Sequence, residues 1–284
     1  MLKTLRYKTI MIIYLLALIV TCALRIIQFF SMTDSVTGFA ETDMEYSVLF
    51  INILLVLFGV CLICIGRLTH RKPKVIPYNN PLFSLASILT MLGLLFNCIH
   101  ILSSNQLNIN FVVDLFGLIG FASVVYSLLI KRTVKKPFAV AISAYMLVRL
   151  ILSFIYYNGL QHISESNLEI FSICLATVFV IIYSQCICDI NSTSSFTWLL
   201  PIGLATSYMC FVSAIPKVIA FFVKKPLVHS TSCSFMFILL LGAFALLSTH
   251  CIYNIKNLKS HDSSVNELKI EPTSNNDVKF YFND

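Results

Sequence analysis

The sequence predicts an all-α protein, a polytopic transmembrane bundle of about eight helices. Hydrophobic residues make up 58% of its 284 residues and charged residues only 12%, whereas about a quarter of the residues in a soluble globular domain are charged. The apolar residues also gather into runs about as long as the roughly 20 residues that a helix needs to cross a bilayer. We therefore expect one membrane-embedded bundle over residues 1–255 and a polar, disordered tail over residues 256–284.

Charged and proline-containing segments separate the first four runs. The first run follows a short basic N-terminus and leads into residues 31–45, which include several acidic residues and no lysine or arginine. Basic residues between positions 67 and 74 precede prolines, which favour a helix boundary before the third run. A short uncharged connection joins the third run to the fourth, and basic residues follow again at 131–136. The runs expected from this pattern cover residues 9–30, 46–68, 82–102 and 111–130.

The last four runs are bounded in a similar way. The fifth contains Arg149, and Ser166 or Asn167 can cap the start of the sixth. Pro216 lies near the end of the seventh run, and a proline removes a helical hydrogen bond. We expect this helix to kink or stop there and the lysine-containing residues 217–226 to lie along the membrane surface. A re-entrant segment is the alternative, and a misread boundary here would reduce the helix count to seven. The expected runs cover residues 137–158, 168–190, 196–222 and 231–255.

The lysines and arginines predict the orientation of the bundle. With this arrangement of helices, most of the 20 lysines and arginines lie in the N-terminus, in alternate connections and in the tail. Basic connections remain in the cytoplasm, so we expect both termini to be cytoplasmic. Because the basic residues flank apolar runs, their partner is the lipid bilayer and we expect no binding of nucleic acid.

Arg149 needs a partner because it lies inside an apolar run. A charge near the bilayer centre costs about 2.5–3.5 kcal/mol on insertion scales. Helix arithmetic places Arg149, Arg25 and Asp114 in the outer half of the membrane, and His100 and Glu165 are close to the same level. These five residues form our candidate ligand-binding site, an outward-facing polar pocket for an anionic solute or lipid.

Each of these residues also has a purely structural interpretation. Arg25 can extend its side chain to the outer headgroups, and a buried pair between Arg149 and Asp114, or between Arg149 and a loop glutamate, can serve architecture alone. Asp114 can cap the start of its helix, and His100 is typical of an interfacial histidine. Depth in the membrane does not by itself show that two helices are neighbours, so both interpretations stay open.

The sequence contains none of the common catalytic or nucleotide-binding motifs, such as HExxH, GxSxG or GxxxxGK[ST]. Cys61 and Cys64 have the spacing of half a metal site, but they lie within an apolar run without a second pair of ligands. We expect no catalytic residue, no metal, no cofactor and no structural disulfide.

Three features of the sequence form a further pattern: Arg25-Ile-Ile-Gln28 followed by Asp34-Ser-Val-Thr37-Gly38-Phe39, Arg149 followed by Ser164-Glu165, and the step from Ser213 to Pro216. This pattern resembles that of a family of uncharacterised multi-pass membrane proteins of clostridia-type bacteria. The resemblance covers most of the membrane region and implies a bacterial plasma-membrane location. It implies no activity, and no functional residue is transferred from it.

Three functions are compatible with this sequence. The first is a binding or transport module in which Arg149 supplies a permanently charged donor group and Asp114 positions it. The second is a non-catalytic accessory or sensor subunit of a membrane complex, whose basic inner connections contact a partner protein. The third, which we rank last, is a membrane enzyme that acts on a lipid-linked substrate with His100 or a glutamate as the acid or base.

Overall fold

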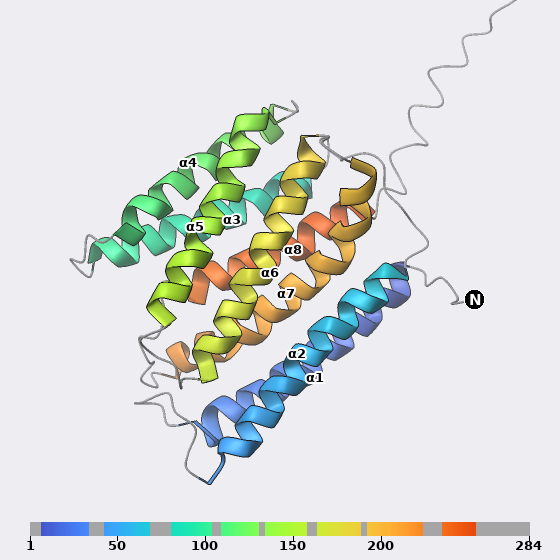
Figure 1. The fold of residues 1–284 in the computed structure, drawn as a ribbon, viewed down its shortest axis with the longest axis vertical. Helices are drawn as coiled ribbons and strands as arrows, with labels where there is room; N and C mark the ends of the chain where they lie inside the picture. The colour runs from blue at the N-terminus through green and yellow to red at the C-terminus, as the bar shows by residue number, and fades with distance from the viewer. Residues whose placement is uncertain are drawn as a thin grey trace, which may run out of the picture. The chain divides into compact units, whose positions relative to one another are not determined.

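The computed structural model describes residues 7–33, 43–68, 81–103, 109–130, 134–157, 164–188, 192–223 and 235–253. In these residues the chain forms eight α-helices, and all eight are long and apolar enough to cross a membrane (Figure 1). The helices are α1 (Tyr7–Ser31), α2 (Glu45–Arg67), α3 (Pro81–Ser103), α4 (Ile109–Leu129), α5 (Lys136–Tyr157), α6 (Ser164–Ile187), α7 (Ser192–Phe222) and α8 (Phe235–Tyr253). The predicted fold class is confirmed, and the protein is an integral multi-pass membrane protein.

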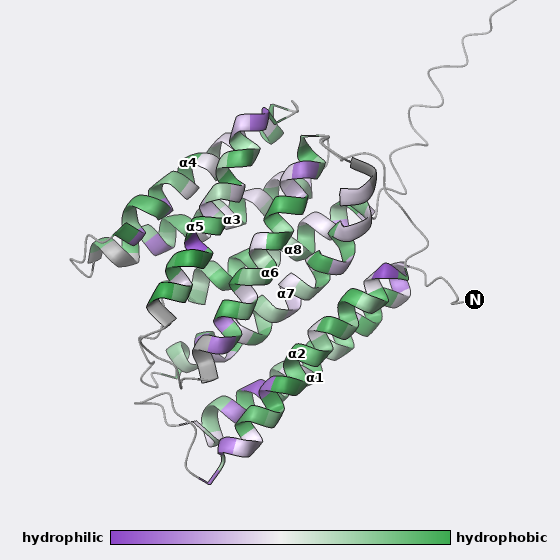
Figure 2. Cartoon of the chain, in the orientation of Figure 1, coloured by the Kyte–Doolittle hydropathy of each residue, from purple (hydrophilic) through white to green (hydrophobic). Residues whose placement is uncertain are grey.

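Hydrophobic residues cover most of each helix, on exposed faces as well as buried ones (Figure 2). Ile19 of α1, Phe50 of α2 and Phe116 of α4 are all exposed. Lipid solvates such side chains well, but it offers no hydrogen bonds to the backbone, so each crossing segment pairs its backbone groups within a helix. The tail expected at residues 256–284 lies outside the described residues.

α7 is the central helix of the bundle, and it contacts α1, α2, α6 and α8. The remaining contacts join α3 to α4 and α8, α4 to α5, α5 to α6, and α1 to α2. α6 also contacts α8 and α2. The five helices α3, α4, α5, α6 and α8 therefore contact one another in a closed order, and we call this group the five-helix ring.

The course of α7 corrects one expectation. The helix continues through Pro201 and Pro216 to Phe222, so residues 217–222 do not lie along the membrane surface. Residues 224–226 lie outside the described part of the chain. A proline inside a membrane helix is tolerated where neighbouring helices surround it, and Ala214, Ile215 and Lys217 lie in a segment of α7 that packs among other helices.

α2 and α7 approach each other closely near the start of α7. A Cβ atom on Gly66 would lie 2.7 Å from the Cα of Pro201, whereas a Cβ on Gly59 would lie 3.6 Å from the sulfur of Met209. Beside this contact, the guanidinium of Arg67 lies 3.4 Å from the ring centroid of Trp198, in a cation–π arrangement. The missing side chain of Gly66 therefore sets the distance between the two helices.

These two glycines provide a matched test of the helix contact. We expect Gly66→Ala to lower the free energy of unfolding by about 1–3 kcal/mol, because the new methyl group overlaps backbone that cannot rotate away. Gly59→Ala should change it by less, since a Met209 side chain can adjust. Unfolding of both variants in mixed micelles, followed by circular dichroism, measures the difference. Equal stability of the two variants would contradict the proposed packing.

Candidate functional site

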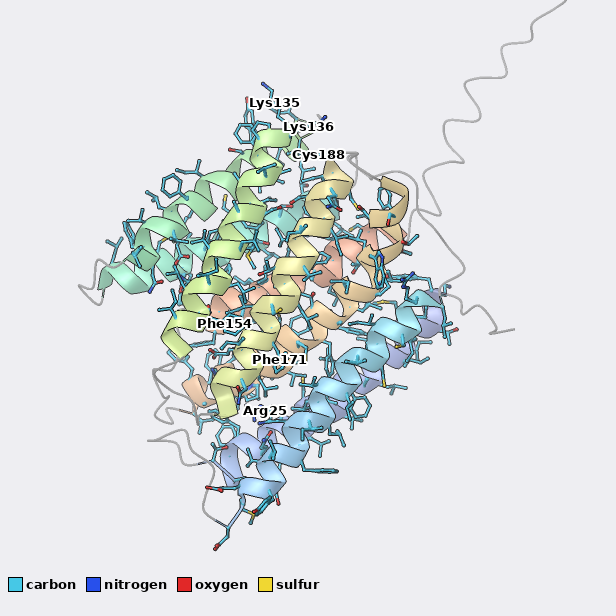
Figure 3. The ribbon with its side chains drawn as sticks, viewed as in Figure 1. Arg25, Lys135, Lys136, Phe154, Phe171 and Cys188 are labelled. Atoms are coloured by element: carbon cyan, nitrogen blue, oxygen red, sulfur yellow. The ribbon has the colours of Figure 1, made fainter. Side chains whose placement is uncertain are left out.

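Charged side chains are buried at one side of the bundle, which we call the loop-1 side because the chain leaves α1 and enters α2 there. Among the described residues, the buried charged side chains are Arg25, Asp114, Arg149, Glu169 and Lys217. Each lies five to eight residues from the helix end on this side, which is about 7–12 Å at 1.5 Å per residue. α5 and α6 show the polarity of the bundle, since Lys135, Lys136 and Cys188 lie toward one end and Phe154 and Phe171 toward the other (Figure 3).

Asp114 is the centre of a polar cluster that joins α3, α4 and α5. Its Oδ2 accepts a hydrogen bond of 2.5 Å from Nδ2 of Asn97, and its Oδ1 accepts one of 3.1 Å from the Tyr145 hydroxyl. Nη1 of Arg149 lies 3.5 Å from Asp114 Oδ1 and donates to Oδ1 of Asn110 at 3.4 Å. Asp114 and Arg149 are both 0% exposed. The expected pair between Arg149 and Asp114 is thus present.

Local sequence spacing brings these side chains together. Asn110 and Asp114 are four residues apart on α4, as are Tyr145 and Arg149 on α5, so each helix presents two polar groups on one face. A Cβ on Gly117 would lie 2.6 Å from the Tyr145 ring, so the absence of a side chain there lets the ring lie against α4. The predicted site contained neither Tyr145 nor Asn110, although this four-residue spacing was a signal for both.

The lengths of these contacts distinguish the two charged groups. Hydrogen bonds from N–H to oxygen are usually 2.7–3.2 Å long. Asp114 receives its shorter contacts from the neutral donors Asn97 and Tyr145, while both contacts of Arg149 Nη1 to Asp114 and Asn110 are longer than this range. Asp114 is therefore positioned chiefly by neutral groups, and Arg149 lies beside it as an ion pair at longer range.

A second buried ion pair joins α6 to α7 through Glu169 and Lys217. Both residues are buried, and among the described residues no hydrogen-bond partner is present for Oε2 of Glu169. This pair gives the physical reason why Lys217 does not lie at the membrane surface. A carboxylate from the neighbouring helix compensates its charge within the bundle, so the side chain needs no headgroup.

Arg25 belongs to a third cluster, between α1 and α2. Its Nη1 donates to Oε1 of Gln28 at 2.6 Å, and Gln28 Nε2 donates to Oδ1 of Asn52 and to the Val48 carbonyl, both at 3.1 Å. Arg25 is 0% exposed, so its side chain does not extend to the headgroups, which was the structural alternative for this residue. The reason is that Gln28, one helical turn later, offers an acceptor inside the protein.

The structure divides the predicted pocket between clusters. It brings Arg149 and Asp114 into contact, but Arg25 is on α1, which contacts α2 and α7, whereas Asp114 and Arg149 are on α4 and α5. His100 belongs to α3 and Glu165 to α6, but the side chains of both lie outside the described part of the structure. The estimated depth in the membrane predicted that these residues lie at a similar level. It did not predict which of them contact one another.

Within the described residues, no group of three or more His, Cys, Asp or Glu side chains could hold a metal ion. Comparison with family models, curated proteins and solved structures found no match to the chain.

The Asp114–Arg149 pair makes a testable prediction about stability. Asp114→Leu leaves the buried guanidinium without its carboxylate, and we expect the free energy of unfolding to fall by about 3–5 kcal/mol. The double variant Asp114→Leu/Arg149→Leu removes both charges and should recover most of that loss, since paired removal of buried charges is often close to neutral. Unfolding in mixed micelles measures both values.

Asn110→Ala is the control, because it removes only a long contact of Arg149 and should cost about 1 kcal/mol or less. The single variant Arg149→Leu completes the comparison. If the effects of Asp114→Leu and Arg149→Leu simply add in the double variant, the two charges do not interact and the pairing is wrong.

Proposed function

We propose that the protein binds or transports an anionic solute or lipid through the cluster around Asp114 and Arg149. One observation carries this proposal. A fully buried guanidinium lies beside a carboxylate that is itself held by shorter hydrogen bonds from Asn97 and Tyr145. A charged residue at membrane depth is by default a candidate functional site.

The geometry supports recognition of a carboxylate or phosphate group. Arginine presents five N–H donors in a plane and binds such groups with two parallel hydrogen bonds. Asp114 compensates the charge of Arg149 at 3.5 Å without depending on that contact for its own position. A ligand anion can therefore take hydrogen bonds from Arg149 while Asn97 and Tyr145 keep Asp114 in place.

The distribution of basic residues supports entry from outside the cell. Lys135 and Lys136 are exposed at the start of α5, and Arg67 lies in the last turn of α2, all on the side opposite to the buried charges. By the positive-inside rule this opposite side faces the cytoplasm, which orients both termini inward and the loop-1 side outward. Together with the resemblance described above, this supports a location in a bacterial plasma membrane.

An accessory subunit is the second candidate, and the burial of the clusters favours it. The Asp114 cluster joins α3, α4 and α5, and the Glu169–Lys217 pair joins α6 to α7. Such pairs can specify one helix arrangement without binding a ligand. In that case the basic cytoplasmic connections would contact a partner protein of the membrane complex.

Native mass spectrometry of the gently solubilised protein tests the proposal. We expect a discrete bound species on the wild-type protein that is lost from the folded double variant Asp114→Leu/Arg149→Leu. The control Arg67→Gln, which removes an arginine on the opposite side, should keep it. The mass distinguishes a phospholipid from a small anion, and a bound protein subunit would instead favour the accessory role.

Thermal unfolding with inorganic phosphate or acetate, at matched ionic strength, gives an independent readout. At about 100 times its Kd, a bound anion stabilises the folded state by about 2.7 kcal/mol, so the wild type and Arg67→Gln should unfold at higher temperature while the double variant does not. Equal shifts in all three proteins would show that the anions act elsewhere and would reject the site.

A further inference from the structure

Aromatic side chains from all five helices meet inside the five-helix ring. We call them the aromatic cluster: Phe83 of α3, Phe121 of α4, Tyr145 of α5, Phe179 and Tyr183 of α6, and Phe244 of α8. Every helix of the ring thus contributes at least one aromatic ring. All are buried, and five of the six are at most 1% exposed.

The contacts within the cluster cross the interior of the ring. The centroid of Phe244 lies 6.1 Å from that of Phe121, 5.6 Å from that of Phe179 and 5.0 Å from that of Tyr183, and the rings meet edge to face. Phe83 lies 5.8 Å from Tyr183. Edge-to-face pairs at these distances are favourable, so the side chains form a continuous apolar layer between helices that face each other.

Polar side chains lie beside and among the rings of this layer. Asn97, Asp114 and Arg149 lie toward the loop-1 side. At the level of the rings, the Ser143 hydroxyl donates to Ser184 Oγ at 3.0 Å, and Ser87 Oγ lies 3.3 Å from the Tyr183 hydroxyl. The ring therefore presents a polar cluster toward the loop-1 side, followed by aromatic rings with a few hydroxyl groups among them.

Tyr145 connects the polar cluster directly to the apolar layer. Its hydroxyl donates to Asp114 Oδ1 at 3.1 Å, while its ring meets the Phe121 ring edge to face at 6.4 Å. The position of the ring is thus coupled to the position of the carboxylate that pairs with Arg149. A change at Asp114 is transmitted to the aromatic cluster through one side chain.

We propose that the five-helix ring is the route of the anion across the membrane and that the aromatic cluster is its closed barrier. This inference rests on the proposed function, because it takes Arg149 as the site that the anion reaches first. Closely packed aromatic rings exclude both water and an anion, so passage requires the rings to separate. Tyr145 is the positioning residue that links occupancy of the anion site to the barrier.

Anion flux into proteoliposomes tests the route. The vesicles contain a fluorophore that iodide quenches, and iodide is added outside. We expect Phe244→Ala, which removes the ring at the centre of the cluster, to raise the rate of quenching about tenfold over wild type, equivalent to about 1.4 kcal/mol. Phe196→Ala is the matched control, because Phe196 is an equally buried phenylalanine on α7, outside the ring, and it should leave the rate unchanged.

Two further variants make the test independent of one substitution. Phe179→Leu shortens a second ring of the cluster with a smaller loss of volume, so it remains informative if Phe244→Ala does not fold, and it should also raise the rate. Tyr145→Phe keeps the aromatic ring but removes its hydrogen bond to Asp114. We expect it to raise the rate of iodide entry and to weaken phosphate-dependent stabilisation, because Tyr145 also positions Asp114. Loss of the hydroxyl from a tyrosine that only packs would change neither.

The outcomes separate this inference from the proposed function. If folded Phe244→Ala or Phe179→Leu admits iodide no faster than wild type while phosphate still stabilises the protein through Arg149, the route is wrong and the anion site stands. If phosphate stabilises neither the wild type nor any variant, the proposed function itself fails. Faster entry through Phe196→Ala as well would show general leakiness and would also overturn the route.

Discussion

Hydrocarbon does not solvate charge, and this constraint determines which helices of the bundle must be neighbours. Asp114 lies within α4, Arg149 within α5 and Lys217 within α7, and all three are buried. Each is compensated from another helix, Asp114 and Arg149 by each other and Lys217 by Glu169. Breaking such a pair costs several kcal/mol, so the order α3–α4–α5 and the contact between α6 and α7 are specified by electrostatics as well as by packing.

The fold class and one contact of the site, between Arg149 and Asp114, could be predicted from the sequence. Apolar runs of membrane length predict the helices, because length and hydropathy are local properties. The pair between Arg149 and Asp114 was predictable because an intramembrane charge requires a partner at the same depth. The grouping of the clusters was not predictable in this way. Arg25 has the same depth as Arg149, but depth says nothing about which face of a helix meets which neighbour.

Lys217 and Pro216 show why a prediction from neighbouring sequence alone was wrong near the end of α7. A lysine outside the cytoplasmic segments and a proline near a helix end both favour a surface segment when they are judged locally. In the structure α7 is surrounded by four helices, which protect the backbone near the proline, and Glu169 compensates the lysine. Both exceptions arise from neighbours on other helices, which are distant in sequence.

Trp198 is the one tryptophan in the chain, and it lies under the guanidinium of Arg67 at the junction of α2 and α7. Its indole is therefore the single site of tryptophan fluorescence in the protein. A cation above the ring shifts and quenches this emission, so separation of α2 from α7 alters the spectrum without any attached dye. The fluorescence of Trp198 therefore reports movement between α7 and the α1–α2 pair.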